Sequence, residues 1–147
     1  MKLAKNLLAG LTGAVALNIL HETLKKTSQD MPRIDLLGEE ALQKGLNLFG
    51  YEISDDDNLY LATLGADIVS NASYYSMIGA GSNKQIWPKA IALGLAAGIG
   101  AVTLPKPIGL NPEPVARNIK VSALTIAYYL AGALVTASVL TATTSKK

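Results

Sequence analysis

NLYLATLGADIVSNASYYSMIGA, residues Asn58–Ala80, is the stretch that decides the fold, because it is long and apolar enough to cross a bilayer. As a helix, it places its polar side chains on one face, namely Thr63, Asp67, Ser70, Asn71 and Tyr74. A charge at membrane depth is costly, so such residues usually face the interior of a helix bundle and have a function. The stretch therefore predicts a polytopic membrane protein with a polar seam between its helices.

The composition narrows the class of protein. The chain has 147 residues, a one-domain length, and we expect residues 1–147 to form a single transmembrane domain. Half of the residues are hydrophobic and only 16% are charged, against roughly 25% in a typical soluble domain. A net charge of +2, without basic residues interleaved with aromatic ones, argues against a nucleic-acid partner. With no cysteine and a single histidine, we expect neither a metal site nor a cofactor.

Four apolar runs predict an all-α fold, a compact bundle of four transmembrane helices. The expected spans lie at about residues 6–24, 58–80, 89–104 and 117–141. Helices are required because lipid offers the backbone no hydrogen-bond partners. The first run resembles a signal peptide, but cleavage after Ala14–Ala16 would leave an apolar region of only about seven residues, the bare minimum. We therefore interpret it as the first transmembrane helix.

Small residues characterise the third run, where Gly94 and Gly98 form a GxxxG pattern. Such residues let two helices approach closely. We therefore expect the helix at 89–104 to be the most buried and to contact at least two others. The pattern favours packing inside the bundle, although a homodimer is compatible with so small a protein.

Residues at about 33–49, between the first two runs, predict a short amphipathic helix. Leucines and Phe49 form one stripe, and Glu39, Glu40, Gln43 and Lys44 lie opposite. Beside membrane spans, such a helix either lies in the lipid–water interface or is a packed connector, and the sequence supports both interpretations equally.

Polar residues at one end of the predicted bundle are expected to form a cluster. In a four-span topology, the end of the first span and the start of the fourth lie on the same side of the membrane. The candidate ligand- or ion-binding residues are Asp67, Asn71, His21, Glu22, Asn18 and Tyr128, with Arg117 and Lys120 beside them. At ~1.5 Å per residue, Asp67 is expected about a dozen ångströms deep. Alternatively, these side chains only hydrogen-bond between helices or extend to the headgroups.

Known catalytic patterns are not met. His21-Glu22-Thr23-Leu24-Lys25 begins like the zinc-protease pattern H-E-x-x-H but ends in lysine. An aspartyl hydrolase needs two close carboxylates, and the candidates Asp67 and Glu22 are expected at different depths. Catalytic residues therefore stay unassigned.

Three functions remain open from the sequence. The first is the binding or transport of a proton, ion or small solute at Asp67. The second is a structural or assembly subunit of a membrane complex, and the third is a membrane-embedded acid–base enzyme acting on a lipid-like substrate. The first two are favoured, which makes a non-enzymatic role the expectation. The bilayer is the expected partner, and the general composition is typical of small proteins of the bacterial cytoplasmic membrane.

Overall fold

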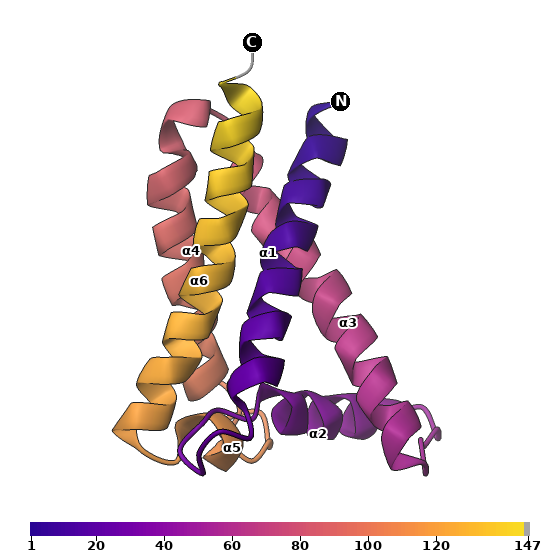
Figure 1. The fold of residues 1–147 in the computed structure, drawn as a ribbon. Coiled ribbons are helices and arrows are strands. Elements are labelled where there is room, and N and C mark those ends of the chain that lie inside the picture. The colour runs from indigo at the N-terminus through magenta and orange to yellow at the C-terminus, as the bar shows by residue number, and fades with distance from the viewer. Residues whose placement is uncertain (146–147) are drawn as a thin grey trace.

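Helices are the regular elements of the computed structural model, which describes residues 1–145 (Figure 1). The expected all-α class is thus confirmed over these residues. The α-helices are α1 (Lys2–Leu24), α2 (Ile34–Asn47), α3 (Asp56–Ser76), α4 (Ile86–Thr103), α5 (Glu113–Ala116) and α6 (Ile119–Thr144). Two short 3-10 turns, η1 (Met77–Gly79) and η2 (Asn83–Gln85), connect α3 to α4.

Within residues 1–145, three helical segments are long and apolar enough to cross a membrane. They are α1, the segment Asn83–Thr103 that contains α4, and α6. α3 does not qualify, because aspartate, asparagine, serine and tyrosine interrupt its apolar residues. The structure is therefore compatible with a membrane protein, and it confirms the expected four-span bundle only in part.

α6 is the most buried long helix, and α1 and α4 both pack against it. Its buried residues run along its whole length, namely Val121, Thr125, Tyr128, Gly132, Ala133, Thr136, Ala137 and Leu140. The expectation that the helix at 89–104 is the most buried is therefore wrong. α4 buries a single small-residue face that includes Gly94 and Gly98, whereas Ile91, Leu95 and Ile99 are exposed.

Glycines allow the long helices to approach closely. A Cβ atom on Gly98 would lie 2.6 Å from the Ile126 Cα atom, and one on Gly94 would lie 2.9 Å from the Ala133 Cβ atom. On α1, a Cβ atom on Gly10 would overlap the backbone oxygen of Ala72 in α3. These contacts fix α4 against α6 and α1 against α3.

Large apolar side chains cover the outer face of the bundle. On α1, they recur at helical spacing as Leu3, Leu7, Leu11, Val15 and Ile19, all exposed. A soluble monomer rarely exposes a continuous apolar surface of this kind, whereas lipid chains accommodate it. The outer face thus agrees with the apolar character of the three candidate spans.

α2 lies across the end of the bundle opposite the two chain ends (Figure 1). It occupies Ile34–Asn47, close to the amphipathic segment predicted at 33–49. Hydrogen bonds hold it to the connection between α4 and α6: Arg33 N donates to Pro114 O at 2.8 Å, and Asn111 N donates to Glu40 Oε2 at 2.9 Å. Figure 1 also shows α3 diverging from α1 toward the far end of α2, so that the three helices form a triangle.

Candidate functional site

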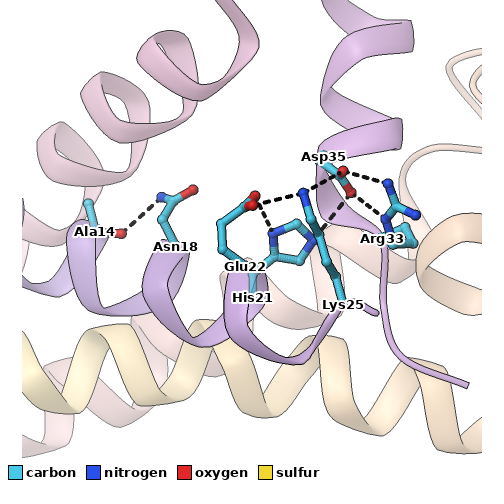
Figure 2. Close-up of polar contacts among 7 residues, drawn as sticks. All are labelled: Ala14, Asn18, His21, Glu22, Lys25, Arg33 and Asp35. Carbon is cyan, nitrogen blue, oxygen red and sulfur yellow. Dashed lines mark hydrogen bonds and ion pairs between the residues drawn. The ribbon is translucent and has the colours of Figure 1, made fainter. Parts of the chain in front are cut away.

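A network of charged side chains joins the end of α1 to the start of α2 (Figure 2). His21 is only 3% exposed and lies between two carboxylates. Its Nδ1 atom is 3.4 Å from Glu22 Oε1, and its Nε2 atom is 3.3 Å from Asp35 Oδ1. The only histidine of the chain therefore links two helices that are separated by a loop.

Asp35 is the centre of this network. Arg33 donates to both of its carboxylate oxygens, from Nε at 2.9 Å and from Nη2 at 2.8 Å. Lys25 Nζ lies 3.4 Å from Asp35 Oδ2 and 2.8 Å from Glu22 Oε2. Two-point contact with a guanidinium is the strongest common form of carboxylate pairing, so Asp35 is firmly held.

The contacts of Asp35 and Lys25 determine the protonation states of these two side chains. Burial alone would raise the pKa of Asp35, but His21 and Arg33 outweigh it and hold the pKa well below its usual range. For Lys25, burial alone would lower the pKa, but the contacts with Glu22 and Asp35 outweigh burial and raise the pKa. Asp35 and Lys25 are therefore both charged at neutral pH.

A small cavity of about 10 Å³ lies behind the network, between α1, α2 and α3. It is lined by Asn18, His21, Glu22, Asp35, Tyr60, Thr63, Leu64 and Asp67. Two buried atoms at this cavity, His21 Nε2 and Thr63 Oγ1, have no hydrogen-bond partner among residues 1–145. The His21–Asp35 approach is close in distance but lacks hydrogen-bond geometry. The volume is of the order that holds a single water molecule.

A larger groove, of about 570 Å³, opens between α3 and α4 with α2 as its floor. Its walls are mainly apolar and come from Ile34, Leu37, Gly38, Ala41, Ala96, Ala97, Gly100, Ala101 and Leu104. Asp67, Ser70, Asn71, Tyr74 and Tyr129 add polar atoms on one side. Asp67 lines both the groove and the small cavity, and no hydrogen bond or ion pair from residues 1–145 reaches its carboxylate.

Asp67 lies where α3 approaches α2. A Cβ atom on Gly38 would be 2.7 Å from Thr63 Cγ2 and 4.0 Å from Asp67 Oδ1. Asp67 is thus beside α2. Its expected depth of about a dozen ångströms in a membrane stays a prediction.

The structure brings together four of the predicted site residues, Asn18, His21, Glu22 and Asp67, around the small cavity. Asn71 lies one helical turn from Asp67 and lines the groove. Tyr128 lies elsewhere: it is 2% exposed, and its hydroxyl contacts Met31 Sδ at 3.7 Å. Its neighbour Tyr129 reaches the groove instead.

Arg117 and Lys120 do not join His21, although they lie at the expected end of the bundle. Their nearest carboxylate is Asp30, at 3.9 Å from Arg117 Nη2 and 3.8 Å from Lys120 Nζ. Asp30 belongs to the loop after α1, which passes in front of α5 (Figure 1).

Asp35 is the residue that sequence reasoning missed. It lies within the predicted amphipathic segment at about residues 33–49 and was not among the candidate site residues. A signal was nevertheless present, because Asp35 interrupts the apolar residues Ile34, Leu36 and Leu37. An acid within the apolar part of an amphipathic helix is costly unless it is paired, which indicates a basic partner on a neighbouring helix.

No family model, curated protein or solved structure matches the chain. The interpretation of the site therefore depends on its geometry and chemistry.

Proposed function

We propose that this protein binds a small amphipathic solute from the membrane in the groove between α3 and α4, with Asp67 receiving the polar end. The observation that carries the proposal is the carboxylate of Asp67, which has no hydrogen-bond or ion-pair partner among residues 1–145 and lies on the wall of a mainly apolar groove. The volume of the groove, about 570 Å³, is within the range of small-molecule sites, which are mostly apolar with a few polar groups.

The chemistry of the groove indicates the class of solute. Alanine, leucine and glycine side chains of α2 and α4 fit a hydrocarbon portion. A partly buried carboxylate without a donor is unfavourable, so a ligand that supplies an ammonium or hydroxyl group would stabilise it. Asn71 and Ser70, on the same side of the groove, add further hydrogen-bonding groups. A cationic or neutral amphiphile fits these walls better than an anionic one.

The proposal includes a membrane crossing by α3. The chain leaves α1 at the end of the bundle that holds α2 and enters α4 at the opposite end (Figure 1). α3 packs against α1 and connects the two ends, so it is the segment that returns the chain across the bundle. Its polar side is turned toward the groove and the small cavity, which reduces the cost of polar residues in the membrane.

Single-chain amphiphiles with different head groups provide a direct test. Dodecylamine and dodecanol should raise the unfolding temperature of the purified protein, because a ligand of the native state stabilises it. Dodecanoate, which has the same chain length but an anionic head, should have little effect. Asp67→Asn should fold but lose the preference for the amine.

A groove-filling variant supplies the control. Gly100 lines the groove, and a Cβ atom there would meet only Leu104 at an ordinary 3.5 Å, so Gly100→Leu should fill the groove without separating helices. Gly65 has nothing within 4 Å and is outside the groove. Gly100→Leu should abolish the response to dodecylamine and Gly65→Leu should keep it. Equal responses of the two variants would refute the groove as the binding site.

Proton exchange is a second candidate function, favoured by the small cavity. Asp67 lines both the groove and this cavity, where His21 Nε2 and Thr63 Oγ1 have no hydrogen-bond partner in the described part of the chain. One water molecule there would connect Asp67 to His21 and so to the charged network. Proton flux into liposomes under a pH gradient tests this function: Asp67→Asn and His21→Gln should each abolish it. Unchanged flux in both variants would exclude it.

A further inference from the structure

A second hollow, of about 510 Å³, lies at the end of the bundle that carries α2. Its basic lining residues are Lys25, Lys26, Arg33 and Arg117, and Ser28 and Gln29 add polar side chains. These residues come from the end of α1, the loop that follows it, and the short segment between α5 and α6. Among residues 1–145, no acidic side chain lines the hollow, which separates it chemically from the groove at Asp67.

The basic side chains around this hollow are not fully neutralised. Lys25 and Arg33 are paired with Glu22 and Asp35 on the side of the network. Arg117 has only the long 3.9 Å contact with Asp30, and Lys26 is exposed and has no ion pair within residues 1–145. The hollow therefore has an excess of positive charge with donors that can turn toward an anion.

The position of the hollow relates it to the membrane surface. It lies where the apolar helix α1 ends and just before the apolar helix α6 begins. The ends of membrane-crossing helices lie at the level of the lipid headgroups, where lysine and arginine side chains attract the negative charge of anionic lipids. Lysine and arginine are also the side chains that bind phosphate most effectively.

We propose that this hollow binds the phosphate of an anionic phospholipid headgroup, with Lys26 and Arg117 as its principal contacts. Lys25 and Arg33 contribute positive charge from the side of the His21–Asp35 network. The proposal is independent of the groove, since the two share no lining residue.

The experiment is a lipid titration of the detergent-purified protein followed by native mass spectrometry. Phosphatidylglycerol and phosphatidylcholine with identical acyl chains are compared, because they differ in net charge. Wild type should bind phosphatidylglycerol preferentially. The double variant Lys26→Gln/Arg117→Gln should weaken that binding by roughly tenfold or more, while binding of phosphatidylcholine stays the same. Lys26→Gln alone should cause a smaller loss of phosphatidylglycerol binding. Because Lys26 is exposed, this variant should fold as the wild type does.

A matched control removes the same charge elsewhere. Lys84 and Lys106 are exposed and outside the hollow, and Lys106 lies in the chain connection between α4 and α5. Lys84→Gln/Lys106→Gln should keep the preference for phosphatidylglycerol. Equal weakening in the two double variants would overturn the site, as would equal binding of the two lipids by wild type. Displacement of the bound lipid by millimolar inorganic phosphate would assign the hollow to soluble phosphate and overturn the lipid proposal.

Discussion

Asp35 is the residue on which the charged network depends, because it contacts His21, Lys25 and Arg33 at once. It is 7% exposed, so its negative charge is stabilised by these contacts rather than by bulk water. The arrangement also fixes the start of α2 against the end of α1. Loss of this one carboxylate would leave several positive charges close together.

Replacing the carboxylate should destabilise the fold. Asp35→Asn should lower the free energy of unfolding by about 3 kcal/mol, the lower end of the range for breaking a buried pair, because the Arg33 side chain is 31% exposed. Glu39→Gln on the same helix is the control, since Glu39 forms no ion pair within residues 1–145. Thermal unfolding in detergent measures both, and equal unfolding temperatures for the two variants would contradict the role of Asp35.

The same carboxylate predicts a pH dependence. The pKa of Asp35 is lowered in the folded protein from its ordinary value of 3.8, so the unfolded chain takes up a proton first as the pH falls. The stabilisation is therefore fully present at neutral pH and is lost progressively below about pH 4. Wild type should lose stability more steeply than Asp35→Asn between pH 5 and pH 3. Parallel unfolding-temperature profiles over that interval would disprove the prediction.

At the scale of helices, close packing depends on glycines at particular contacts. Gly98 and Gly94 belong to the same GxxxG pattern and both face α6, whereas a Cβ atom on Gly100 would meet only Leu104, the residue that follows α4. α4 therefore uses one face for packing, and its large apolar residues face outward. The C-terminal part of α3 packs closely against α1. Toward its N-terminal end, α3 diverges from α1, which leaves room for α2 and the groove.

A methyl group on Gly98 should separate α4 from α6. The new Cβ atom would lie 2.6 Å from the Ile126 Cα atom, and a backbone atom cannot move aside as a side chain can. Gly98→Ala should therefore lower the free energy of unfolding by about 1–3 kcal/mol. Gly65→Ala, also within a helix but with open space around it, should be neutral or stabilising by up to ~1 kcal/mol. Chemical unfolding in mixed micelles compares the two, and the opposite order would show that the α4–α6 contact is misplaced.

At the scale of the whole molecule, the start of α1 and the end of α6 lie at one end of the bundle and α2 lies at the other (Figure 1). A crossing by α3 makes the number of spans even, which puts the two ends of the chain on one side of the membrane. We expect that side to be cytoplasmic, because the short basic segments at the chain ends are the easiest to retain.

Labelling in intact cells tests this topology. The chain contains no cysteine, so single cysteines introduced at Lys2 and Lys84 should be protected from an impermeant reagent added outside. Cysteines introduced at Glu52 and Lys106, at the end that holds α2, should react. Labelling of Lys84→Cys together with Lys106→Cys would place them on the same side and exclude a crossing by the segment Asn83–Thr103.

The sequence alone determined the helical class, the apolar runs that became α1, α4 and α6, and the short helix at Ile34–Asn47. These features depend on local composition and on the helical period, which are written in consecutive residues. Of the cluster predicted from the sequence, the structure brings Asn18, His21, Glu22 and Asp67 together around the small cavity.

Only the tertiary structure decided that His21 pairs with Asp35, that Tyr129 rather than Tyr128 reaches the groove, and that α6 rather than α4 is central. Each of these outcomes depends on the rotation and tilt of one helix against another. Those angles are set where helices approach closely, at backbone contacts of Gly10 and Gly98 and at the contact of Gly38 with the Thr63 side chain. A step of one residue along a helix turns the side-chain direction by about 100°. Local patterns specify which residues form a helix, whereas contacts between distant residues specify which way its side chains point.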